Sequence, residues 1–140
     1  MINDIAAVRS HDHLCLIYQD DAEMLAALVP FFRNGLDRGE RCIYIGDSPP
    51  VAERFAALVR DGLVVMDTRD AYLRDGSFDL DRMLSLFRET VAGVRRDGRA
   101  MLRVAGEAAW MLTGAPGVER FFEYESRVNE LFAELEIAAL

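Results

Sequence analysis

Short apolar runs alternate with helical patterns along almost the whole chain, and this alternation constrains the fold more than any other feature of the sequence. Apolar runs of strand length occupy residues 13–18, 41–45, 63–66 and 100–105. Between and after them, apolar side chains recur at intervals of three, four and seven residues, as on the buried face of a helix. Strands that alternate with helices favour parallel pairing through right-handed crossovers. The sequence therefore predicts an α/β domain with a mainly parallel sheet of four or more strands.

Four helices are predicted from these intervals, and residues with known capping preferences lie near their ends. Asp20 and Asp21 suit the N-terminus of the first helix, and Gly39 suits its end. In the second helix, Ser48 supplies a capping hydroxyl before two prolines in the first turn. The predicted apolar faces comprise Leu25, Leu28, Val29, Phe32 and Leu36; Val51, Phe55, Leu58 and Val59; Leu80, Met83, Leu84, Phe87, Val91 and Val94; and Phe121, Tyr124, Val128, Leu131 and Leu135.

Length and charge indicate one domain that does not itself contact nucleic acid or a membrane. The chain has 140 residues, 51% of them hydrophobic, which is enough for a core of its own. Its 24 acidic and 16 basic residues give a net charge of −8, which disfavours DNA, RNA and anionic membranes. The sequence shows neither a signal peptide nor an apolar run near the roughly 18 residues of a membrane span, so we expect a cytoplasmic protein. Residues 137–140 are again apolar, as at the start of another strand, so a domain truncated at this strand is an alternative to a complete domain over residues 1–140.

The first predicted strand-to-helix turn lacks the chemistry of a phosphate loop. All 16 basic residues are arginine, so the chain has no lysine for a phosphate loop or a Schiff base. The turn Gln19-Asp20-Asp21 also lacks glycines, and its two carboxylates would repel a triphosphate. This argues against ATP hydrolysis and favours helix capping over metal binding for Asp20 and Asp21.

The two cysteines lie in apolar runs that read as buried strands. Cys15 and Cys42 are therefore predicted as reduced core residues of a cytosolic protein, with a disulfide between them as the alternative. His11, His13 and Cys15 alternate, so in a strand they would project to one side, as the ligands of a metal or haem sensor. Only three ligands are present and no Cys-x-x-Cys motif supports them, so a structural role is favoured.

Candidate site residues lie just after the predicted strands, where ligands bind in open parallel sheets. His13 and Tyr18 mark the ends of the first run. Tyr72 lies in the polar stretch 67–79, the longest connection in the chain and a candidate loop over a site. These three side chains are predicted to contact a ligand.

A second group of candidates surrounds the end of the run at 100–105. Arg103, Glu107 and Trp110 supply a cation, a carboxylate and an aromatic wall, a mixture that suits a mostly apolar pocket. An internal Arg103–Glu107 ion pair with Trp110 in the core is an equal alternative. Tyr124 and Glu125 on the last helix are interpreted as ordinary core and surface residues. No Gly-x-Ser-x-Gly motif or supported nucleophile–histidine pair occurs, so the sequence does not predict an enzyme.

At these residues the sequence resembles the MEDS family, a sensory domain of methanogens and methylotrophs. The resemblance extends over nearly the whole chain in the expected order. It rests on His11-x-His13-Leu14-Cys15-x-x-Tyr18, on Phe32 with Gly35-Leu36-x-x-Gly39-Glu40-x-Cys42-x-Tyr44, on Arg103-x-x-Gly106-Glu107-x-x-Trp110, and on Tyr124-Glu125-x-x-x-Asn129. The family usually continues with a strand that carries a cysteine and a Tyr-Asp pair, and this chain ends before it.

The resemblance implies a fold and a function. The fold would be a three-layer sandwich similar to the RecA and KaiC ATPases, with a degenerate phosphate loop. The function would be a non-enzymatic signal-input domain that binds a small, mainly apolar organic molecule, without a cofactor, and regulates a kinase or a transcription regulator. Homodimerisation stays open. The alternatives are a nucleotide-binding RecA-like ATPase domain, a metal or haem sensor, and a pure interaction module.

Overall fold

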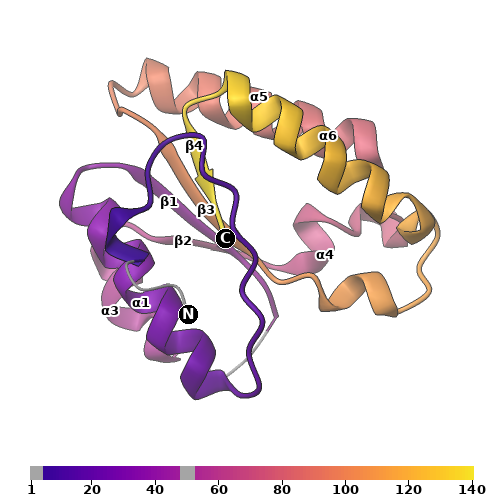
Figure 1. The fold of residues 1–140 in the computed structure, drawn as a ribbon, viewed down its shortest axis with the longest axis horizontal. Helices are drawn as coiled ribbons and strands as arrows, with labels where there is room; N and C mark the ends of the chain where they lie inside the picture. Colours follow the sequence, from indigo (N-terminus) through magenta and orange to yellow (C-terminus); the bar gives the residue numbers. More distant parts are fainter. Residues whose placement is uncertain (1–4, 48–52) are drawn as a thin grey trace.

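The computed structural model describes residues 5–47 and 53–140, which form a mixed α/β domain around one parallel sheet. The strands are β1 (Arg41–Ile45), β2 (Val64–Met66), β3 (Leu102–Gly106) and β4 (Ile137–Ala139). Their order across the sheet is β2-β1-β3-β4, and every neighbouring pair is parallel (Figure 1). The predicted α/β class and parallel pairing are confirmed, and the apolar run at 137–140 does contain a strand.

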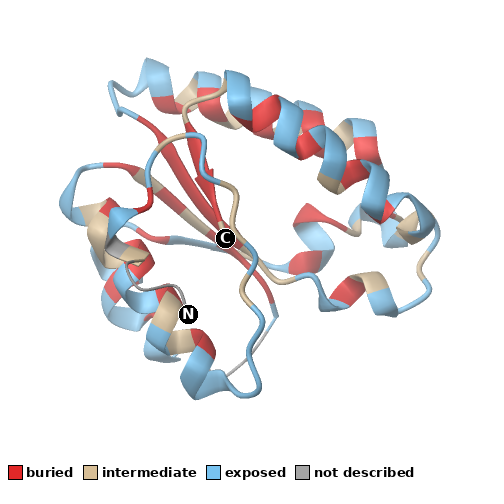
Figure 2. Cartoon of the chain, in the orientation of Figure 1, coloured by how far each residue is buried: buried red, intermediate tan, exposed pale blue. Residues whose placement is uncertain are grey.

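Helices cover both faces of this sheet. α1 (Asp21–Asp37) and α3 (Ala56–Arg60) pack on one face, while α5 (Leu80–Arg96) and α6 (Phe121–Glu134) cover the other (Figure 1). Buried side chains form two clusters, one on each side of the strands (Figure 2). The described residues thus form three layers. The short elements are the helix α4 (Thr68–Ala71) and the 3₁₀ turns η1 (Ile5–Ala7), η2 (Arg74–Gly76), η3 (Ala109–Leu112) and η4 (Val118–Arg120).

The ends of the long helices follow from local capping. The Asp20 carboxylate accepts a hydrogen bond of 2.9 Å from the Glu23 amide at the start of α1, which confirms its capping role. Gly39, just beyond α1, has φ of 73°, a conformation that glycine adopts without strain. The predicted cap at Ser48, its prolines and Val51 lie outside the described residues. Val29 and Val59, predicted on inner helix faces, are exposed.

The first predicted strand, residues 13–18, is wrong. Only His13 pairs with the sheet, through a parallel bridge to Ala139. The Leu14 amide donates to the Ala139 carbonyl at 2.9 Å, after which the segment leaves the sheet. The reason is tertiary: β4 takes the position beside β3, and the segment meets only the outer edge of β4.

This change also corrects the reading of the cysteines. Cys15 lies beyond the bridge and is exposed, whereas Cys42 on β1 is buried as predicted. Both thiols are free, so the alternative of a disulfide between them is not realised.

The polar stretch 67–79 is not a continuous loop. α4 and η2 occupy part of it, and the side chain of Asp67 caps α4 by accepting a hydrogen bond of 2.7 Å from the Arg69 amide. Within the described ranges, no helix has the length and apolar character needed to cross a membrane.

Candidate functional site

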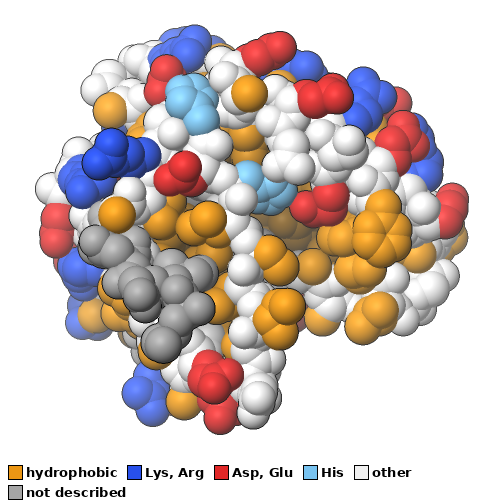
Figure 3. All heavy atoms as spheres, viewed as in Figure 1, with side chains coloured by type: hydrophobic (Ala, Val, Ile, Leu, Met, Phe, Trp, Pro, Cys, Tyr) orange, Lys and Arg blue, Asp and Glu red, His pale blue; other side chains and the backbone are white. Residues whose placement is uncertain are grey.

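A cavity of about 620 Å³ opens at the carboxyl ends of β3 and β4. Residues from α1 and α6 line opposite sides of it, and the segment 13–18 contributes a third side. The space-filling view shows hydrophobic side chains gathered in a hollow beside a histidine and acidic side chains (Figure 3). The strand ends contribute Val104, Ala105, Gly106, Glu107, Ala139 and Leu140 to the lining. This is the edge of the sheet at which the sequence predicts a ligand-binding site.

Aromatic rings form much of the lining. All four tyrosines of the chain reach the cavity: Tyr18, Tyr44, Tyr72 and Tyr124. Tyr72 and Tyr124 are hydrogen-bonded to each other, and burial is the main cause that raises the pKa of both hydroxyls. The tyrosines are therefore neutral at physiological pH and contribute aromatic rings and uncharged hydroxyls to the lining.

Glu107 is the carboxylate on the α1 side of the cavity. It follows β3, and its backbone amide donates to the Ile45 carbonyl at 2.9 Å. Its carboxylate accepts a hydrogen bond from the Tyr44 hydroxyl. The pKa of Tyr18 is raised first by burial and then by the charges of Glu107 and Asp21. Negative charge thus dominates this side.

Gly46 makes the close approach of Tyr44 and Glu107 feasible. A Cβ atom on Gly46 would lie 2.5 Å from the Tyr44 hydroxyl oxygen and 2.7 Å from Cδ of Glu107. A larger residue here would require the Tyr44 or Glu107 side chain to shift.

His13 and two residues of α6 form the polar group on the opposite side. Nδ1 of His13 lies 2.7 Å from Oδ1 of Asn129, and Nε2 lies 3.6 Å from Oε2 of Glu125. The imidazole also meets the Phe132 ring edge-on, with 5.4 Å between the centroids. Burial raises the pKa of Glu125, while the neighbouring His13 acts in the opposite direction. The α6 wall therefore contains a second, partly desolvated carboxylate.

The structure brings together four of the six predicted site residues. These four line the cavity: His13, Tyr18, Tyr72 and Glu107. Glu125 and Tyr124, interpreted as ordinary helix residues, also line it, as do Tyr44 and Asn129. Tyr44, Tyr124, Glu125 and Asn129 belong to the motifs that carry the family resemblance, and this was the one sequence signal that could have placed them here.

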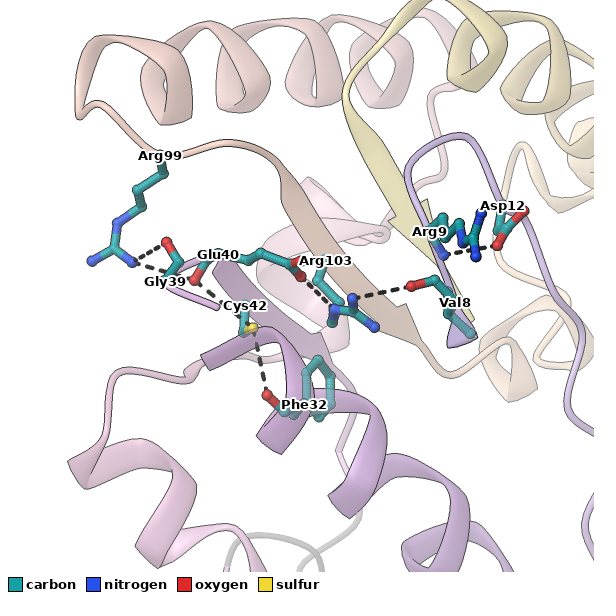
Figure 4. Close-up of polar contacts among 9 residues, drawn as sticks. All are labelled: Val8, Arg9, Asp12, Phe32, Gly39, Glu40, Cys42, Arg99 and Arg103. Atoms are coloured by element: carbon teal, nitrogen blue, oxygen red, sulfur yellow. Dashed lines mark hydrogen bonds and ion pairs between the residues drawn. The ribbon is translucent and has the colours of Figure 1, made fainter. Parts of the chain in front are cut away.

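Arg103 lies outside the cavity, on the buried α1 face of β3. Its Nε donates to Oε2 of Glu40 at 2.6 Å, and Nη2 donates to the Val8 carbonyl at 3.4 Å (Figure 4). The guanidinium also lies 4.8 Å from the centroid of the Phe31 ring. The predicted Arg103–Glu107 ion pair is absent, because residues four apart in an extended strand are separated by about 13 Å. Arg103 thus supports the core and the N-terminal segment.

Trp110 belongs to the core behind the cavity. Its ring stacks on Tyr72 with 4.8 Å between centroids, and contacts Phe78 at 4.8 Å and Phe121 at 5.6 Å. The indole is only 5% exposed and does not line the cavity. Of the two interpretations, the core position is the one observed, and Trp110 holds the Tyr72 ring in place.

The proposed metal ligands are not brought together. Nδ1 of His11 lies 2.8 Å from the Phe132 carbonyl oxygen, while His13 faces Asn129. In the part of the chain that the structure describes, no group of three histidine, cysteine or acidic side chains is arranged to hold a metal ion.

Comparison with known proteins gives a family for the chain. The profile of the family described as the methanogen/methylotroph, DcmR sensory domain (MEDS) matches residues 12–140. The transcriptional repressor DcmR of Methylorubrum extorquens (strain DM4) is 27% identical over 129 residues, which cover 85% of this chain and 46% of the repressor. The chain thus spans less than half the length of this relative. No solved structure matches at a significant level. The match to almost the entire chain shows that it belongs to the MEDS family of sensory domains.

Proposed function

We propose that this chain is a non-enzymatic signal-input domain that binds a small, mainly apolar organic molecule in the cavity beside β3 and β4. The observation that carries the proposal is the cavity itself, with a volume of about 620 Å³ and a largely aromatic and aliphatic lining. Such a concave, mostly apolar space with a few oriented polar groups is the usual form of a small-molecule site. His13, Tyr18, Tyr72 and Glu107 are the predicted residues that would contact the ligand.

The regulatory half of the proposal rests on the family. The family description is a sensory domain, and the DcmR relative is a transcriptional repressor. We infer that the domain acts on an attached or partner transcription regulator or kinase in the cytoplasm, without contacting nucleic acid itself. Homodimerisation would be one way to transmit the signal.

Ligand binding would act by shifting a population between two states of the domain. A ligand in this cavity touches α1, α6 and the segment 13–18 together, so it stabilises the arrangement in which all three surround it. A partner that contacts any of these elements would detect the shift.

The fold relation to the RecA and KaiC ATPases also stays a proposal. The parallel sheet between two helical layers supports it. The turn Gln19-Asp20-Asp21, at the start of α1, has neither glycine nor lysine to hold a phosphate. Two carboxylates also line the cavity, so a nucleoside triphosphate is disfavoured as its ligand.

Native mass spectrometry of the protein purified from its own host tests ligand binding, because a retained molecule appears as added mass. Ala108→Trp fills the cavity from an exposed lining position, and Ala26→Trp adds the same side chain at an exposed position of α1 that does not line it. We expect added mass on the wild type and on Ala26→Trp, and none on Ala108→Trp. Added mass that persists in Ala108→Trp would place the ligand elsewhere, and its absence from all three proteins would contradict the proposal.

A further inference from the structure

The cavity presents carboxylates and aromatic rings, and no arginine among the described residues balances their charge. Glu107 and Glu125 line its two sides, and the chain carries 16 basic residues, all arginines. Among the described residues, none of these arginines is part of the lining. The one basic group there is the His13 imidazole, which lies 3.6 Å from Glu125. Glu107 has no basic group of the lining beside it.

Three of the four tyrosine hydroxyls of the lining are hydrogen-bonded within the protein. The Tyr44 hydroxyl donates to Glu107, and the hydroxyls of Tyr72 and Tyr124 are hydrogen-bonded to each other. A ligand therefore meets the rings of these residues more than their hydroxyls. The negative faces of aromatic rings attract organic cations, most strongly where water is excluded.

From this combination we propose that the ligand of the cavity is a small organic cation of the alkylammonium type. The inference rests on the proposed function, because it assigns the chemical class of the molecule bound in the same cavity. The cationic centre would lie against the Glu107 carboxylate and the tyrosine rings, and its alkyl groups would contact the aliphatic lining. Such a ligand is apolar over most of its surface and carries the one charge that the cavity lacks. A phosphate or carboxylate ligand would instead meet two carboxylates of its own sign.

A pair of molecules of nearly equal shape isolates the effect of the charge. Choline carries a trimethylammonium group, and 3,3-dimethyl-1-butanol carries a neutral tert-butyl group in its place. Titration calorimetry on the full chain, at low ionic strength, compares the two. We expect choline to bind about tenfold or more tightly than the alcohol, because cation–π and carboxylate contacts favour the charged molecule alone.

Glutamine variants link the preference to the cavity. Glu107→Gln keeps an acceptor for the Tyr44 hydroxyl but removes the charge, so we expect it to reduce the preference for choline several-fold. Glu130→Gln removes an exposed charge of α6 that does not line the cavity, and should leave the preference unchanged.

The two proposals fail in different ways. Equal binding of both molecules, or an equal loss of choline binding in Glu107→Gln and Glu130→Gln, would overturn the cationic ligand and leave an apolar ligand in place. Absence of binding by either molecule would also overturn it. In each case, native mass spectrometry tests the proposed function separately. Added mass on the wild type that is lost in Ala108→Trp supports a ligand in this cavity, whatever its charge.

Discussion

The Tyr44 hydroxyl on β1 donates a hydrogen bond to the carboxylate of Glu107, which follows β3. These two residues are 63 positions apart in the sequence, and parallel pairing places Tyr44 opposite Ala105, two positions before Glu107. Burial and this hydrogen bond raise the pKa of Tyr44, so the hydroxyl keeps its proton as a donor. The contact therefore fixes the orientation of a charged group at the edge of the cavity.

Gly46→Ala should disrupt this contact. The added Cβ would overlap the Tyr44 hydroxyl and Glu107, so we expect a loss of about 1–3 kcal/mol in the free energy of unfolding. Ligand affinity should fall as well, because Glu107 is displaced. Urea unfolding and calorimetry measure the two effects.

Gly93→Ala is the matched control for this change. A Cβ at Gly93 meets its nearest atom at 3.7 Å, an ordinary contact, and the residue lies inside α5. Alanine there should stabilise the protein by about 0.5–1 kcal/mol and leave binding unaltered. Similar destabilisation by both substitutions would show that Gly46 has no special role.

Arg103→Met should destabilise the domain far more than it affects the cavity. The substitution leaves Glu40 buried without its partner, which costs about 3–5 kcal/mol in comparable pairs. The exposed Arg33–Asp61 pair has the same length, 2.6 Å, yet Arg33→Ala should cost far less, because solvent screens an exposed ion pair. Denaturant unfolding of both variants tests the contrast. Equal losses would mean that burial of the Arg103 pair has no energetic consequence.

The two cysteines should differ sharply in reactivity. Burial raises the pKa of the Cys42 thiol to about 12, so this residue is protonated and inaccessible at pH 8. Cys15 is exposed and lines the cavity. A thiol reagent at pH 8 should label Cys15 quickly and Cys42 only after unfolding, as peptide mapping would show. Rapid labelling of Cys42 in the folded protein would contradict its position on β1.

Glu125→Gln should alter the dependence of stability on pH. Burial raises the pKa of Glu125 in the folded state, so its ionised form opposes folding above that pKa. This cost disappears as the pH falls below the ordinary pKa, where the carboxyl is protonated in both states. The gain in the free energy of unfolding of the variant over the wild type should therefore be larger at pH 7 than at pH 3.5. Unfolding curves at several pH values check the sign, and a difference that grows on acidification would contradict it.

The sequence could predict the parts of the fold that depend on local periodicity. The six apolar positions of α5 are all buried as their spacing predicts, and β1 has the predicted limits. It could not predict the failure of the strand at 13–18, because that depends on β4 occupying the place beside β3. Competition between two apolar segments for one sheet position is decided by tertiary packing, which local patterns do not contain.

The sequence could predict the site residues that follow the strands, but not those that lie within a strand. Residues after the strands, such as Glu107, were found because parallel strands bring their carboxyl ends together. Arg103 does not reach the cavity, because its position inside β3 directs its side chain to the α1 face, where it pairs with Glu40. Tyr44 was overlooked because a tyrosine within an apolar run reads as core. Its role depends on a partner from another strand.

The segment between Leu14 and Gln19, which forms one side of the cavity, is hydrogen-bonded at both of its ends. Leu14 is hydrogen-bonded to β4, and the Gln19 amide donates to the Glu23 carboxylate in the first turn of α1. Five residue steps of extended chain span at most about 18 Å. Because both of its ends are held, this segment would limit the size of the molecules that enter the cavity. The segment would thus select ligands by size. A ligand too large for the cavity would strain β4 and α1 together, because the two ends of the segment are bonded to them.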